Sequence, residues 1–179
     1  MDANKLKETI EATINKTEYQ PGYPNWYGRT VLKLPLKPGS QPDSTWCIIA
    51  AWEILKNLGY DVDLIVKPRD DKAGIWYTTP DEMEYYAENG ARNGKIKIIT
   101  EQEAQDQANN GIGVLVCATA VESKTGHIAV VAPGKYDPQN GCTVGQAGGE
   151  NGIFSRVRGF GPPGKFVSFP KFYLLPMKG

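Results

Sequence analysis

Histidine is the scarcest residue of this 179-residue chain, which contains only one, His127. A zinc centre built on two or three histidines is therefore excluded. Any reaction step that needs an imidazole to move a proton must use His127. Cysteine is also rare, with Cys47, Cys117 and Cys142 only, and no two of them have CxxC spacing. Zinc-ribbon and thioredoxin-like motifs are therefore disfavoured.

An odd number of cysteines cannot form a closed set of intramolecular disulfides. One bridge with one free thiol, or three free thiols, both remain open. The N-terminal segment MDANKLKETIEATINK is polar and lacks the apolar core of a signal peptide. No apolar run reaches the ~18–20 residues that cross a bilayer. We expect a soluble chain that can still act outside the cell, through a removed leader or another export route.

The chain has no excess of either charge, with 20 Lys and Arg against 20 Asp and Glu. Nothing in this balance points to nucleic acid or to an anionic membrane as a partner. Hydrophobic residues make up 40% and charged residues 22%, which is ordinary for a globular protein. The length predicts a single domain covering residues 1–179, and no pattern indicates a metal or another cofactor.

Apolar periodicity and capping residues predict four helices. The segment TWCIIAAWEILKNL forms the clearest amphipathic pattern, and Gly59 is placed to end it. The sequences TPDE and TEQE have the capping-box pattern that begins a helix. The predicted helices cover residues 3–16, 45–58, about 80–90 and about 101–111.

Most of the remaining chain predicts strands, so the expected fold class is α+β, with N-terminal helices packed on an antiparallel meander. The alternation of apolar residues in 62–66 indicates a short strand. Residues 18–44 are broken by prolines and rich in aromatic residues, which is typical of a segment that packs over a core or lines a groove. Further strands are predicted at residues 113–120, 127–132 and 142–148, with closing strand structure at 167–174.

The first turn of helix 45–58 places Cys47 where free backbone N–H groups and the helix dipole stabilise an anion. A nucleophilic thiolate belongs at such a position, although a small buried core residue would also suit it. His127 opens the strand HIAVV, and a histidine there can point at a neighbouring helix end. A thiol and a base within ~3 Å would form an efficient nucleophile.

A third residue should orient the imidazole by accepting its second N–H. Gln146 lies on the next predicted strand and is the first candidate, with Asn151 and Glu150 as alternatives. The oxyanion would be bound by backbone N–H groups at the helix start. Gln41, six residues before Cys47, is a candidate side-chain donor, unless it is an ordinary solvated loop residue.

The TWC helix, the segment GHIAVV and the segment GQAG together resemble the papain-like cell-wall cysteine hydrolases. These are the NlpC/P60 and CHAP peptidases and the related amidase domains of phage endolysins and secreted bacterial effectors. The resemblance covers about residues 40–160 and implies a papain-like NlpC/P60-type fold. Cys47, His127 and Gln146 match the positions of the catalytic residues, and the spacing of Gln41 resembles that of the oxyanion glutamine.

The resemblance implies cleavage of amide bonds in the stem peptides of peptidoglycan, by a Cys47 thiolate with His127 as acid and base. It further implies action at the cell wall or in the periplasm, with a protein inhibitor or immunity protein as a conceivable partner. A thiol protease or transferase acting on polypeptides, or a non-enzymatic module that binds glycan or a partner protein, are the alternatives. Aromatic residues expected to line the substrate groove are Trp26, Tyr27, Trp46 and Trp76.

Overall fold

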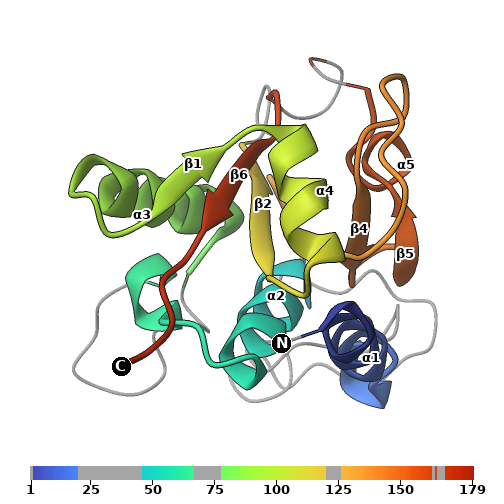
Figure 1. Cartoon of the computed structure of the whole chain (residues 1–179), viewed down its shortest axis with the longest axis horizontal. Coiled ribbons are helices and arrows are strands. Elements are labelled where there is room, and N and C mark those ends of the chain that lie inside the picture. Colours follow the sequence, from blue (N-terminus) through green and yellow to red (C-terminus); the bar gives the residue numbers. More distant parts are fainter. Residues whose placement is uncertain (1, 20–45, 67–77, 120–125, 163, 165–167) are drawn as a thin grey trace, which may run out of the picture.

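The computed structural model describes residues 2–19, 46–66, 78–119, 126–162, 164 and 168–179. Within them the chain forms an open six-stranded antiparallel sheet with helices around it (Figure 1). The predicted α+β class is confirmed. The helices are α1 (Ala3–Ile14), α2 (Trp46–Asn57), α3 (Pro80–Arg92), α4 (Glu101–Asn109) and α5 (Arg156–Phe160), with 3₁₀ turns η1 (Thr17–Tyr19) and η3 (Val62–Ile65). The strands are β1 (Lys97–Ile99), β2 (Val114–Ala118), β3 (His127–Val131), β4 (Thr143–Gln146), β5 (Gly152–Ser155) and β6 (Lys171–Leu174).

The strand order of the sheet is β1-β6-β2-β3-β4-β5, and every neighbouring pair is antiparallel. Strands β2 to β4 follow the predicted meander, and β5, which the sequence did not predict, continues it beside β4. The last strand, β6, departs from a simple meander because it returns to the other edge of β2, where Phe172 pairs with Val116. Strand β1, which the sequence did not predict, pairs with β6 at the edge. All five residues of β2 are buried, as its continuous apolar run predicted.

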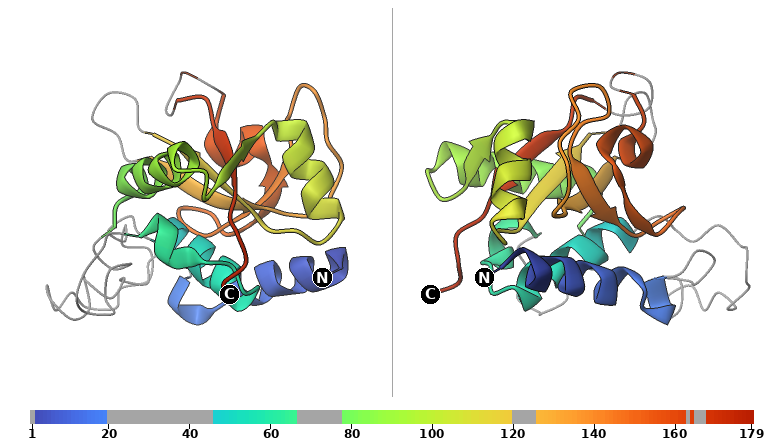
Figure 2. Two further views of the ribbon diagram at one scale, coloured as in Figure 1. Left: turned by 60° about the vertical axis from the view of Figure 1, so that its left-hand side comes forward. Right: turned by 45° about the vertical axis from the view of Figure 1, so that its right-hand side comes forward.

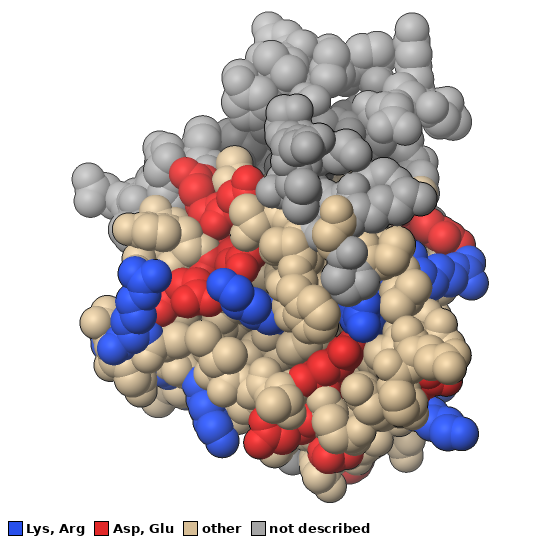
Figure 3. All heavy atoms as spheres, turned by 90° about the horizontal axis from the view of Figure 1, so that it is seen from above, with Lys and Arg blue, Asp and Glu red and all other residues tan. Residues whose placement is uncertain are grey.

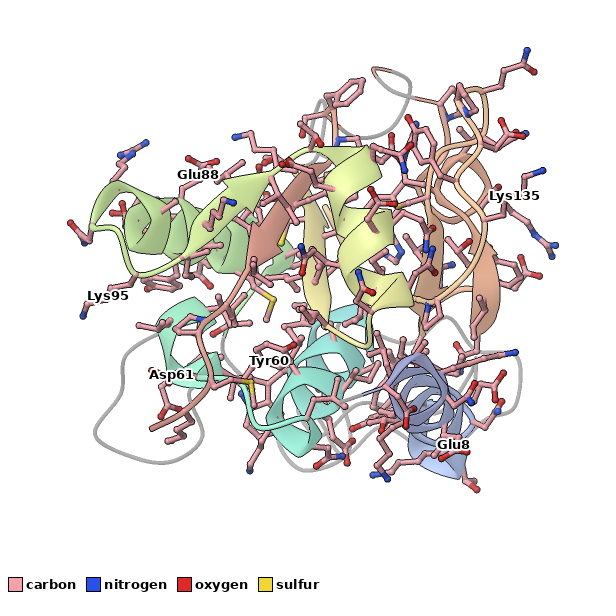
Figure 4. All side chains as sticks on the ribbon, viewed as in Figure 1. Glu8, Tyr60, Asp61, Glu88, Lys95 and Lys135 are labelled. Carbon is pink, nitrogen blue, oxygen red and sulfur yellow. The ribbon has the colours of Figure 1, made fainter. Side chains whose placement is uncertain are left out.

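Helices cover both faces of the sheet. Figures 1 and 2 show α3 and α4 on opposite sides of the strands. Helix α1 approaches β4 so closely that a Cβ on Gly145 would lie 2.3 Å from Cγ2 of Ile10. Tyr60, between α2 and the sheet, accepts a hydrogen bond from the N–H of Gly113 at 2.7 Å (Figure 4). These contacts join the N-terminal helices to the strands in one core.

Both predicted capping boxes are present. The Thr79 hydroxyl accepts the N–H of Glu82, and the Glu82 carboxylate accepts the N–H of Thr79. Thr100 and Glu103 make the same reciprocal pair at the start of α4. Each box satisfies N–H groups that the first helical turn leaves without an intrahelical partner.

Two local predictions are wrong. Helix α3 continues past Gly90 to Arg92, because Gly90 is the position where the side chain of Ile96 packs on the helix, 2.6 Å from where a Cβ would lie. The segment predicted as a strand at 62–66 is the 3₁₀ turn η3. Its buried residues Val62 and Ile65 are three apart, which suits one face of a 3₁₀ turn rather than a strand.

The charges on the surface are mixed, as the balanced composition suggests. Figure 3 shows basic and acidic side chains interspersed over the part of that face drawn in colour. Among the residues that the structure describes, no helix is both long and apolar enough to cross a membrane.

Candidate active site

Cys47 is the second residue of α2 and its side chain is buried. Three backbone N–H groups lie close enough to the thiol to favour its ionised form: its own, that of Ile48 and that of Ile128 on β3. The third of these connects the start of the helix to the residue that follows His127. The structure therefore brings together two segments that lie 80 residues apart in the sequence.

The N–H of Ile128 is available to the thiol because β3 and β4 separate at this point. The N–H of Ala132 bonds to the carbonyl of Thr143 on β4, and alternate N–H groups along a strand point the same way. The β3–β4 register ends at Val130, so the ladder leaves the N–H of Ile128 without a partner on β4. The thiol of Cys47 lies near this N–H.

His127 and Gln146 meet across the same divergence of β3 and β4. Nε2 of His127 lies 2.7 Å from Oε1 of Gln146. The carboxamide NH₂ of Gln146 donates to the carbonyl of Glu150 at 3.2 Å, which leaves its oxygen facing the imidazole. Because that oxygen is only an acceptor, the network assigns the proton of neutral His127 to Nε2. Nδ1 is then the nitrogen that can accept a proton.

Burial determines the ionisation of both reactive groups. It raises the pKa of Cys47 to about 11, because desolvation outweighs the three N–H groups that favour a thiolate. It also lowers the pKa of His127, against the opposite effect of the Gln146 hydrogen bond. The resting pair is therefore a neutral thiol and a neutral imidazole. The helix start therefore does not by itself bring the pKa of Cys47 below its ordinary value.

Helix α5, which the sequence did not predict, lies against the His127–Gln146 pair. The ring of Phe160 meets the imidazole edge-to-face, with centroids 4.6 Å apart and planes at 61°. A Cβ on Gly159 would lie 2.7 Å from Oε1 of Gln146. A five-residue helix among glycines has too few positions to show an apolar period, so the sequence carried no signal for it.

The alternative third residue, Asn151, has other partners. Its side-chain NH₂ donates to the carbonyls of Ile14 and Tyr19, and its oxygen accepts the N–H of Gly148. Asn151 thus connects the end of α1 to the turn between β4 and β5. Glu150 contributes only its carbonyl to the site, as the acceptor for Gln146.

Of the aromatic residues predicted to line a groove, only Trp46 lies within the described residues. Its side chain is 1% exposed and its ring lies 5.5 Å from that of Tyr19, so it belongs to the core rather than to a substrate surface. The apolar packing at the start of α2 explains this burial. The remaining predicted site residues lie outside the described residues: Gln41, Trp26, Tyr27 and Trp76.

All three cysteines are free thiols, and Cys117 and Cys142 are fully buried packing residues. Of the two alternatives for the cysteines, three free thiols is the one found. Within the described ranges, no group of three or more His, Cys, Asp or Glu residues is arranged to hold a metal ion.

Comparison with known proteins adds no assignment: no protein family, no curated protein and no solved structure matches this chain. The functional argument therefore depends on the geometry around Cys47, His127 and Gln146.

Proposed function

We propose that this protein is a cysteine amidase or endopeptidase with a papain-like NlpC/P60-type fold, and that it cleaves amide bonds in the stem peptides of peptidoglycan. One observation carries the proposal. A backbone N–H near the Cys47 thiol belongs to Ile128, the residue after His127, and Nε2 of His127 lies 2.7 Å from Oε1 of Gln146. A thiol, an imidazole and a carboxamide on adjoining segments are the groups that a thiol hydrolase uses as nucleophile, base and orienting acceptor, and this supports the proposal.

The first half of the reaction would begin from the neutral pair. Nδ1 of His127 takes the proton of Cys47 as the sulfur attacks the amide carbonyl, and a tetrahedral intermediate forms. The backbone N–H of Cys47, at the start of α2, is a donor for the oxyanion. Gln146 keeps the proton on Nε2 of His127, so that Nδ1 is free to act as the base.

Collapse of the intermediate breaks the carbon–nitrogen bond. The imidazolium of His127 gives its proton to the departing amine, and the acyl group remains on the sulfur as a thioester. His127 then takes a proton from water, whose oxygen attacks the thioester. The second tetrahedral intermediate releases the carboxylic acid and returns the proton to the sulfur of Cys47.

The choice of peptidoglycan among amide substrates is supported by the resemblance of the TWC helix, GHIAVV and GQAG to cell-wall hydrolases. The geometry itself is common to thiol hydrolases, so a polypeptide substrate is an outcome that the experiment must separate. Purified sacculi and isolated muropeptides would be incubated with the protein, and the products identified by chromatography and mass spectrometry. Casein would be tested in parallel as a polypeptide substrate.

The variants Cys47→Ala and His127→Ala should each reduce muropeptide cleavage by about 10³-fold or more. Cys142→Ala is the matched control, since it removes a buried thiol beside Glu101 rather than beside Cys47, and it should retain cleavage in protein that remains folded. If the protein cleaves casein and leaves the muropeptides intact, its substrate is a polypeptide and not peptidoglycan. Undiminished activity in Cys47→Ala would refute the enzyme mechanism itself.

A further inference from the structure

Two consecutive residues of α5 contact the two members of the acid–base pair. Phe160, which is 4% exposed, lies edge-to-face on the ring of His127. Gly159 lies so close to Gln146 that a Cβ would approach Oε1 to 2.7 Å and Cγ2 of Val144 to 3.0 Å. The imidazole and the carboxamide are thus covered by the same turn of helix, on the side where their hydrogen bond forms.

The position of α5 is held by contacts at its start. The guanidinium of Arg156 donates to the carboxylate of Glu101 on α4, with Nε and Oε1 2.8 Å apart, and both side chains are largely buried. The backbone N–H of Arg156 bonds to the carbonyl of Cys142 at 2.7 Å. The hydroxyl of Ser155 caps the helix. A helix of five residues is not stable by itself, so these anchors determine where Phe160 lies.

Helix α5 also reaches the third member of the network. Arg158 forms an ion pair with Glu150 at 2.6 Å, and the carbonyl of Glu150 is the acceptor that orients the carboxamide of Gln146. The helix therefore contacts all three residues of the hydrogen-bond chain that runs from His127 through Gln146 to Glu150.

We propose that α5 positions the base: Phe160 holds the plane of the His127 ring and excludes water from its hydrogen bond to Gln146, while Gly159 leaves room for the carboxamide. The inference rests on the proposed function for its kinetic consequences, but the geometry can be tested without any substrate. Both are positioning residues, since they act through His127 and Gln146 rather than on a reacting atom.

A physical consequence follows from removing the Phe160 ring. Burial and the Gln146 hydrogen bond are the causes of the pKa shift of His127, and no charged group of the described residues is among them. Water that reaches the imidazole would reduce the effect of burial, which is the larger of the two. The pKa of His127 should then rise toward its ordinary value. Leucine at position 160 would still exclude water, whereas alanine would not.

The lone histidine makes this measurement unambiguous, because NMR titration of the imidazole C–H signals reports His127 alone. Phe160→Ala should raise the pKa of His127 by about 0.5 or more. Phe160→Leu should restore most of the original value. Gly159→Ala should displace the carboxamide and reduce kcat about as much as Gln146→Ala does, and the double variant should add little to either one.

Matched controls come from the same region. Phe154→Ala removes an aromatic ring that lies against Arg158 instead of His127. Gly149→Ala adds a Cβ that meets no atom within 4 Å. Both should leave the titration of His127 unchanged. Circular dichroism and thermal melting would confirm that each variant is folded.

An unchanged His127 titration in folded Phe160→Ala would overturn the inference, whatever the activity of the protein. A shifted titration in a protein that cleaves no muropeptide would retain the positioning role and reject the proposed function. If both Phe160→Ala and Phe160→Leu fail to fold, Gly159→Ala decides, and normal kcat in that folded variant would contradict the role of α5.

Discussion

Nε2 of His127 and Oε1 of Gln146 lie 2.7 Å apart across the point where β3 and β4 diverge. The two residues belong to neighbouring strands and point to the same face of the sheet, because their positions have the same parity in the β3–β4 register. Their hydrogen bond leaves Nδ1 as the imidazole nitrogen that can accept a proton.

Loss of the Gln146 acceptor should affect catalysis more than binding. In Gln146→Ala, the proton of His127 is no longer restricted to Nε2, and we expect kcat for muropeptide cleavage to fall by about 10²-fold with KM nearly unchanged. Gln139→Ala, in the exposed turn before β4, is the matched control and should behave as wild type. A full-rate Gln146→Ala enzyme would mean that another group orients the imidazole.

Alkylation of Cys47 should be slow near neutral pH. With a pKa of about 11, only about one sulfur in 10⁴ is a thiolate at pH 7. The rate with iodoacetamide, followed by peptide mass spectrometry, should increase about tenfold for each pH unit from about pH 6 to pH 9. Protein unfolded in urea should react faster at every pH. A rate plateau at acidic pH that disappears in His127→Ala would instead reveal a preformed thiolate–imidazolium pair.

The protein should lose stability as the pH falls below about 6.5, the ordinary pKa of histidine. The native pKa of His127 is lowered, so between the two values the unfolded chain binds a proton that the native chain does not. As the pH falls between these two pKa values, the free energy of unfolding decreases by at most about 1.4 kcal/mol per pH unit. Above the unfolded pKa, His127 is neutral in both states and no stability is lost.

Urea unfolding at a series of pH values would measure this slope, and His127→Gln should remove it between about pH 5 and 6.5. The carboxylates with lowered pKa titrate below this window, since their shifts start from 4.5 for Glu88 and Glu103 and from 3.8 for Asp137. An identical slope in His127→Gln would assign the acid sensitivity to another group.

The ion pair between Arg156 and Glu101 should contribute strongly to stability, because its side chains are only 7% and 14% exposed. Arg156→Met leaves the Glu101 carboxylate without its cation, and we expect a loss of about 3–5 kcal/mol in the free energy of unfolding. The double variant Glu101→Gln/Arg156→Met should recover part of this loss.

The pair formed by Arg158 and Glu150 is the matched control, with side chains 60% and 59% exposed. Arg158→Met should cost less than about 1 kcal/mol, because solvent screens an exposed pair. Equal losses in Arg156→Met and Arg158→Met would show that burial does not govern the strength of these pairs.

Helix starts and buried strands were predictable because their signals are local. Thr79 and Thr100 each precede an acidic residue at the third helical position, and both capping boxes formed as expected. The apolar run of β2 is buried throughout. A glycine signal failed at Gly90, which remains helical with the side chain of Ile96, just past the helix end, packed against it.

For the candidate site, the residue types and their order along the chain indicated Cys47, His127 and Gln146 before any fold was known. The sequence could not show that the N–H of Ile128 would be left free for the thiol, since that depends on where β3 and β4 separate. Nor could it show Phe160 against the imidazole, since α5 is held in place by Glu101 of another helix.

The sequence by itself determined that any imidazole chemistry in this protein belongs to His127, because a composition with one histidine allows no substitute. It also determined helices α1 to α4 and most strands, whose hydrogen bonds and apolar faces are specified by neighbouring residues. Only the tertiary structure decided the protonation of the pair. Desolvation depends on everything that surrounds a group, and here the surrounding core outweighs the helix start and keeps Cys47 a neutral thiol.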